Sequence, residues 1–200
     1  MIGHEDVTTR RSFGLLFVGV AIGVTAGAAI GEVAILLHFP LYSIILIWVA
    51  SFAVTFGAIM PRFRKAIPAI RARMKNSIAW PTPVKAINGL CWAAPFALIG
   101  VFPHYYQYLI LLGIGLGNLS TYVFMRRYSK LDNKEQLIVS VIALAGIPAA
   151  LAIDSSSFVA SQDVAVMLSR LLIAAAYAAG GIYALAGSSP REVPASGVER

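Results

Sequence analysis

The amino-acid sequence predicts an all-α, polytopic membrane helical bundle with six transmembrane helices and both termini in the cytoplasm. Hydrophobic residues make up 58% of the chain and charged residues only 12%, whereas a soluble domain typically carries about 25% charged residues. The mean hydropathy of the chain is +0.77. Its apolar stretches approach or exceed the length that crosses a hydrocarbon core of about 30 Å, and nearly all basic residues lie between them.

The apolar stretches define the expected spans and the segments around them. The spans are residues 13–39, 41–60, 86–101, 108–125, 136–153 and 164–186. Residues 1–12 are polar and end in Arg10 and Arg11, as expected of a cytoplasmic N-terminus. The first span is about twice as long as the apolar region of a signal peptide, so we expect it to be retained. Residues 187–200 are rich in Ser, Pro and Gly, and we expect a disordered cytoplasmic tail.

The distribution of Lys and Arg predicts which loops are cytoplasmic. Fifteen of the 16 basic residues lie in the N-terminal segment, in the loops at residues 61–85 and 126–135, or in the tail. None lies in a predicted outer loop, such as residues 154–163, and the remaining one is Arg170, inside the sixth span. Because cytoplasmic loops carry an excess of Lys and Arg, we expect an integral protein of the plasma (cytoplasmic) membrane with both ends inside.

The loop between the second and third spans is predicted to form a basic helix on the membrane surface. Apolar residues recur there at helical spacing: Phe63, Ile67, Ile70, Met74 and Ile78. Basic residues on the other face would contact anionic lipid: Arg64, Arg71, Arg73 and Lys75. Trp80 would anchor this helix at the interface. The alternative is an ordinary basic loop, since Pro68 interrupts the pattern.

Two spans carry glycine at every fourth position. These helix-packing candidates are Gly19, Gly23, Gly27 and Gly31 in the first span, with Gly113 and Gly117 in the fourth. On a helix, each set forms a stripe that lets a neighbouring helix approach closely. The two stripes could pack on each other. They could also serve self-association or docking on a partner membrane subunit, and the sequence leaves these alternatives open.

Glu32 and Arg170 are the main candidates for a functional site, because Glu32 is the only acidic residue in an apolar span and ionisable residues inside membranes are costly. Both fall about 10 Å below the outer boundary at 1.5 Å per residue. Asn118 in the fourth span is a further polar candidate. Three interpretations remain: a structural ion pair, a substrate or proton site lining a polar cavity, or two unrelated residues that face water separately.

The remaining chemistry argues against catalysis. The chain lacks the H-E-x-x-H, G-x-S-x-G and phosphate-loop motifs, so we expect no enzymatic activity, no catalytic residue and no cofactor. His38 and His104 fall at predicted outer turns without a third ligand, and we expect no metal site. Cys91 is the only cysteine, which excludes an internal disulfide. The net charge of +7 lies in loops between spans, so nucleic acid is not an expected partner.

Two functional hypotheses follow. The first is a small-solute or ion transporter or channel, with a polar cavity built around Glu32, Arg170 and Asn118. The second is a non-catalytic accessory or assembly subunit of a larger membrane complex, which docks through its glycine stripes. The bilayer and its anionic lipids are partners under both hypotheses, and a homo-oligomer is compatible with either.

Overall fold

The described part of the chain is built of helices. The structure is a computed structural model that describes residues 3–64, 67–68, 71, 80–155 and 162–187, and no strand occurs among them. The α-helices are α1 (Gly3–Leu36), α2 (Leu41–Arg64), α4 (Thr82–Leu98), α5 (Tyr106–Tyr128), α6 (Lys134–Ser155) and α7 (Gln162–Ala186). A short 3-10 helix, η1 (Pro103–Tyr105), precedes α5.

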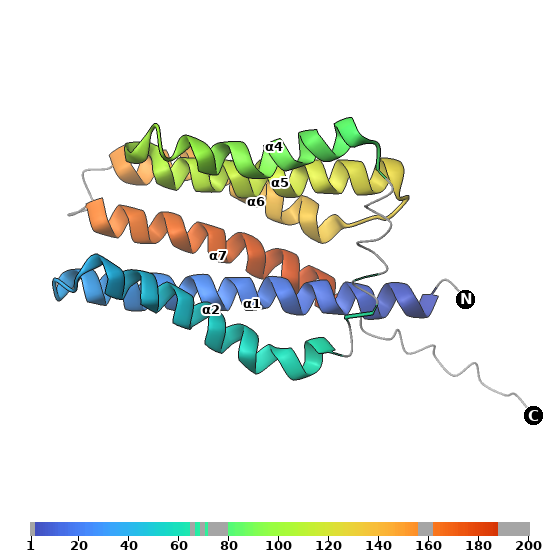
Figure 1. Ribbon diagram of the computed structural model, residues 1–200, viewed down its shortest axis with the longest axis horizontal. Coiled ribbons are helices and arrows are strands. Elements are labelled where there is room, and N and C mark those ends of the chain that lie inside the picture. Colours follow the sequence, from blue (N-terminus) through green and yellow to red (C-terminus); the bar gives the residue numbers. More distant parts are fainter. Residues whose placement is uncertain (1–2, 65–66, 69–70, 72–79, 156–161, 188–200) are drawn as a thin grey trace, which may run out of the picture.

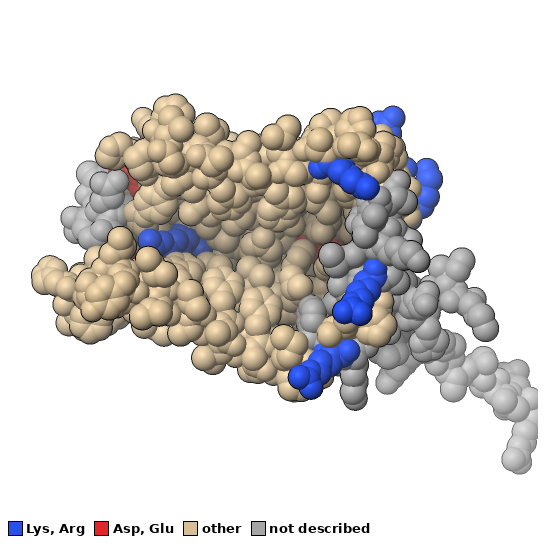
Figure 2. All heavy atoms as spheres, in the orientation of Figure 1, with Lys and Arg blue, Asp and Glu red and all other residues tan. Residues whose placement is uncertain are grey.

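The helices form a bundle in which each helix packs mainly on one or two neighbours. The order of neighbours is α2, α1, α7, α6, α5 and α4, so α1 and α7 lie side by side near the middle although they are far apart in the sequence (Figure 1). The first residues of α1 and the last residues of α7 lie at the same end of the bundle (Figure 1). Lys and Arg side chains gather at this end, as Figure 2 shows.

Length and apolarity identify a multi-pass membrane protein. Among the described residues, five helices are long and apolar enough to cross a membrane: Arg10–Leu36, Leu41–Pro61, Pro103–Tyr128, Lys134–Ser155 and Val166–Ala186. The other long helix, α4, has 17 residues and spans about 25 Å at 1.5 Å per residue. Large apolar side chains cover the outside of the bundle, for example Leu41 and Val54 on α2, which are 73% and 72% exposed. Such a surface suits contact with lipid tails.

Several helix boundaries differ from the expected spans. The first helix begins at Gly3, within the segment expected to be a polar terminus. The second continues through Pro61 to Arg64 instead of ending at Met60, because proline removes only one backbone donor and a helix can continue past it. Helix α6, which corresponds to the fifth expected span, includes Asp154, a residue that the sequence places in an outer loop.

The predicted basic surface helix lies mostly outside the described residues, as do Arg73, Lys75 and nearly all of the predicted tail. Arg64 is the last residue of α2, and the Arg71 side chain is exposed. The prediction for Trp80 was wrong. Its side chain is buried against α4 and α5, and its indole Nε1 donates a 2.9 Å hydrogen bond to Ser129, which satisfies its polar group inside the protein.

The glycine stripe of α1 receives aromatic side chains from α2. A Cβ atom added at Gly27 would lie 2.7 Å from the Trp48 ring, and one added at Gly23 would lie 3.0 Å from Phe52. The same addition at Gly19 would lie 2.9 Å from Ile59. The glycines therefore make room for large side chains of the adjacent helix, and van der Waals contact holds this hairpin together.

The stripe of α5 is filled in the same way by α4. An added Cβ at Gly113 would lie 2.7 Å from the Phe96 ring, and one at Gly117 would overlap Trp92. The expectation that the two stripes pack on each other was wrong, because each faces aromatic side chains of its own hairpin partner. An aromatic ring opposite a bare backbone buries more surface than a second glycine would.

We predict that Gly27→Val destabilises the protein by about 1–3 kcal/mol, because the added side chain would collide with Trp48. Gly57→Val is the matched control, since no atom of another described element or side chain lies within 4 Å of a Cβ at that position. Thermal unfolding in detergent, followed by circular dichroism, measures the difference. Equal melting temperatures for the two variants would contradict this packing.

We also predict that the basic end of the bundle faces the cytoplasm. In a Cys91→Ala background, which has no other cysteine, His104→Cys and Lys130→Cys would introduce thiols at exposed positions near opposite ends of α5. A membrane-impermeant maleimide should label the first in intact cells and the second only after permeabilisation. The reverse pattern would invert the orientation predicted from the basic loops.

Candidate functional site

Glu32 and Arg170 lie on the two central helices, which run antiparallel. A Cβ added at Gly181 of α7 would lie 2.8 Å from the Val18 side chain of α1, which fixes the register of this helix pair. Because the helices are antiparallel, the residue eleven positions before Gly181 on α7 faces the residue eleven positions after Val18 on α1. Arg170 is therefore opposite Ala29. Glu32 is three residues beyond Ala29, about 4.5 Å along the axis. The fold therefore brings the two candidates to neighbouring turns of facing helices.

Both side chains have polar atoms without a partner. Glu32 is 8% exposed, and its Oε2 atom is buried and accepts no hydrogen bond from the described residues. The Nη1 atom of Arg170 is likewise buried and donates none to them. No ion pair joins the two side chains in the described part of the chain. The two charges thus lie on neighbouring turns of facing helices and are not directly paired.

Trp48 holds the guanidinium of Arg170. The Cζ atom of Arg170 lies 5.7 Å from the centre of the Trp48 ring, within the range of a cation–π interaction. The same ring fills the space above Gly27. Trp48 therefore connects the site to the packing of α2 on α1. No pattern in the sequence indicated this role, because the contact joins three helices.

Ser169 is a further buried polar residue, but it lies on a different face of α7 from Arg170. Its side chain is 1% exposed, and its Oγ atom has no hydrogen-bond partner among the described residues. Eleven residues after Ser169, on the same face of the helix, Gly180 faces Val139 of α6, whereas Gly181, eleven residues after Arg170, faces Val18 of α1. Ser169 is therefore not part of the Glu32 and Arg170 site.

Asn118 is buried in the core of the bundle. Its side chain is 2% exposed, and its Nδ2 atom donates a 2.9 Å hydrogen bond to the Ile114 carbonyl oxygen of the same helix. This bond satisfies one of its polar groups without Glu32 or Arg170.

A second polar cluster lies where α5 begins and α6 ends. Gln107 Nε2 donates a 2.7 Å hydrogen bond to Asp154 Oδ2, and the Tyr108 hydroxyl donates to the same oxygen. Gln107 is 3% exposed, so this cluster is part of the packed interface. Asp154 was expected in a loop, and its distance of more than 40 residues from both partners hid the contact.

Polar residues at the start of α6 are also buried. Asn133 and Glu135 are each 1% exposed, although the sequence placed them in a charged inner loop. The Asn133 carbonyl accepts the backbone N–H of Gln136 at 3.0 Å, which begins the helix. Glu135 lies in the first helical turn, where the helix dipole favours a negative charge.

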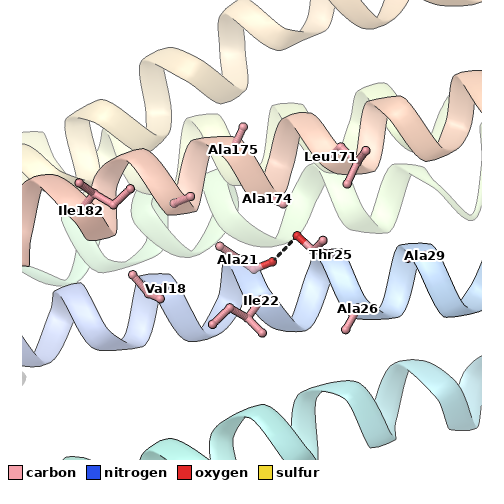
Figure 3. A pocket seen from close by; sticks show the side chains of 11 residues that line it. Val18, Ala21, Ile22, Thr25, Ala26, Ala29, Leu171, Ala174, Ala175 and Ile182 are labelled. Atoms are coloured by element: carbon pink, nitrogen blue, oxygen red, sulfur yellow. Dashed lines mark hydrogen bonds between the residues drawn. The ribbon is translucent and has the colours of Figure 1, made fainter.

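The hollow between α1 and α7 is apolar and separate from these polar groups. It has a volume of about 610 Å³ and is lined by residues such as Ala21, Ala29 and Ala175 (Figure 3). The hydroxyl of Thr25 donates to the Ala21 carbonyl oxygen at 2.8 Å (Figure 3). The described residues contain no group of three His, Cys, Asp or Glu side chains that would hold a metal ion.

These features define a multi-pass membrane protein with a buried carboxylate and a guanidinium on its two central helices. Comparison of the chain with known protein families, with curated proteins and with solved structures finds no match. The function must therefore be argued from the site itself.

We predict that Asp154→Leu destabilises the protein by about 1–3 kcal/mol, because the buried Gln107 and the partly buried Tyr108 would lose the acceptor of their hydrogen bonds. Asp132→Leu is the control: this carboxylate forms an exposed ion pair with Lys134 at 3.5 Å, and such pairs contribute less than about 1 kcal/mol. Thermal unfolding in detergent distinguishes the two. An unchanged melting temperature for Asp154→Leu would show that the second polar cluster is dispensable.

Proposed function

We propose that this protein moves a small solute or ion across the membrane and that Glu32 and Arg170 bind it. One observation carries the proposal: Glu32 Oε2 and Arg170 Nη1 are buried on facing helices, and neither has a hydrogen-bond partner among the described residues. A protein that only needed to pack would gain nothing from this arrangement. Charged groups inside a membrane are expensive and typically mark solute or ion pathways.

The geometry favours a binding site over the other two interpretations. A structural ion pair would join the side chains within about 4 Å, whereas Arg170 instead lies over Trp48. Two residues that face water separately would be well exposed, whereas Glu32 is 8% exposed. A donor and an acceptor that are both buried and unused are best explained by a third species that binds between them.

The position of α2 provides a route for access. Trp48 lies over Arg170, and only 11% of the apolar stretch of α2 is buried inside the bundle. Since α2 packs mainly on α1, a rotation of the Trp48 side chain would uncover Arg170 while the contact of Phe52 with Gly23 keeps α2 on α1. Gating by a peripheral element around a fixed site is a common arrangement in transporters.

The accessory-subunit alternative has less support. It relied on the glycine stripes as docking surfaces, and aromatic side chains of the same chain occupy both stripes. A partner helix could reach these glycines only by displacing Trp48, Phe52, Phe96 or Trp92 from contacts that hold the two hairpins together.

We predict that the purified protein in liposomes accelerates the entry of at least one solute from a panel of salts, polyols and amino acids, measured as re-swelling after a hyperosmotic shock. The double variant Glu32→Gln/Arg170→Met should remain folded, because a buried charged pair can be replaced by uncharged residues of similar size. It should lose the acceleration. Thr25→Val is the control, since Thr25 lines the apolar hollow between α1 and α7 and its hydroxyl donates to the Ala21 carbonyl oxygen of its own helix.

Two results would contradict the proposal. The first is equal re-swelling of wild-type and protein-free liposomes for every solute in the panel. The second is solute entry that the double variant supports as well as the wild type, which would place the pathway elsewhere in the bundle.

A further inference from the structure

We infer that the solute bound between Glu32 and Arg170 is a small zwitterion, a molecule that carries one ammonium group and one carboxylate. This inference rests on the proposed transport function and specifies its substrate class. It follows from three properties of the site: opposite charges that are not paired with each other, donors and acceptors that are segregated between two helices, and an aromatic ring at its side.

The charges of the site are balanced before the solute binds. Glu32 contributes one negative and Arg170 one positive charge, and electrostatic interactions are strong where water is scarce. A simple anion at Arg170 would leave Glu32 uncompensated, and a simple cation at Glu32 would leave Arg170 uncompensated. A zwitterion compensates both residues and adds no net charge to the membrane interior.

The unused polar atoms are arranged to distinguish the two ends of such a molecule. Arg170 Nη1 on α7 can donate a hydrogen bond. It suits a carboxylate, which forms strong charge-assisted hydrogen bonds with a guanidinium. The unused atom of α1, Glu32 Oε2, accepts a hydrogen bond and suits an ammonium group.

The separation of the two residues along their helices limits the size of the solute. Their positions differ by about one helical turn, so we take the solute that spans them to be short, with few carbon atoms between its charged groups. Trp48, which already lies over Arg170, offers an apolar face to the carbon atoms of the solute.

The test compares zwitterions with ions of a single charge. Wild-type liposomes receive a hyperosmotic pulse of glycine, alanine or β-alanine, or of tetramethylammonium chloride or sodium methanesulfonate, whose charges are permanent. We expect the zwitterions to enter roughly tenfold or more faster than in liposomes with Glu32→Gln or Arg170→Met, since a lost charge-assisted hydrogen bond changes affinity by about that factor. The single ions should enter no faster than in protein-free liposomes.

A binding measurement on the unmodified protein makes the test independent of variant folding. Glycine should raise the melting temperature of the wild-type protein in detergent, whereas tetramethylammonium methanesulfonate at the same concentration should not. Glu32→Gln should weaken the effect of glycine, and Thr25→Val should leave it unchanged. Absence of any stabilisation by the three amino acids would overturn the inference.

The outcomes separate this inference from the function on which it rests. Entry of a single ion that depends on Glu32 and Arg170, without entry of a zwitterion, would overturn the substrate class and leave the transport function standing. Entry of no solute at all would overturn both. Entry of zwitterions that both single variants support equally would remove Glu32 and Arg170 from the site.

Discussion

The close contact between glycine backbones and aromatic side chains is the interaction on which the rest of the structure depends. Lipid tails are as apolar as leucine, so helices in a membrane gain little by hiding apolar surface and associate through van der Waals packing. The stripe of α1 accepts Trp48 and Phe52 from α2, and the stripe of α5 accepts Phe96 and Trp92 from α4. The two hairpins formed in this way leave α1 and α5 free to pack on α7 and α6, which complete the centre of the bundle.

Because water is absent from the bilayer core, many polar side chains bond to one another inside the protein. The Asn88 side chain accepts hydrogen bonds from Ser120 and Thr121 across the α4–α5 interface, at 2.8 and 3.0 Å, and Asp154 accepts those of Gln107 and Tyr108. These contacts specify which helices meet. Glu32 and Arg170 each have a buried atom that the described residues leave unpaired, and so do Ser169, Gln107, Asn133 and Asp154. What sets Glu32 and Arg170 apart is that they are opposite charges on facing helices, which is the structural basis of the proposed binding site.

The sequence analysis found the two charged residues of the proposed site and missed Trp48. Glu32 and Arg170 stood out because charged residues are rare in apolar spans, and the comparable depth of the two was accessible from residue counts alone. Trp48 did not stand out, since tryptophan is common in membrane helices. Asn118 was assigned to the same cavity because it is polar, yet it is buried and bonds to Ile114 of its own helix. Polarity identifies candidate residues, whereas the direction of each side chain decides which of them meet.

The sequence by itself determined the class of the protein, the approximate extent of the long apolar helices and the end of the bundle at which basic residues gather, because these depend on composition and on the fixed rise of a helix against the thickness of a bilayer. It also located the stripes of glycine. Only the tertiary structure decided what fills those stripes, that Trp80 and Asp154 are held inside the bundle, and that α1 lies against α7. Such contacts join residues far apart in the chain, and many pairings of apolar helices satisfy the same composition. The choice among them is made by side-chain shape at each interface, which no single segment of the sequence contains.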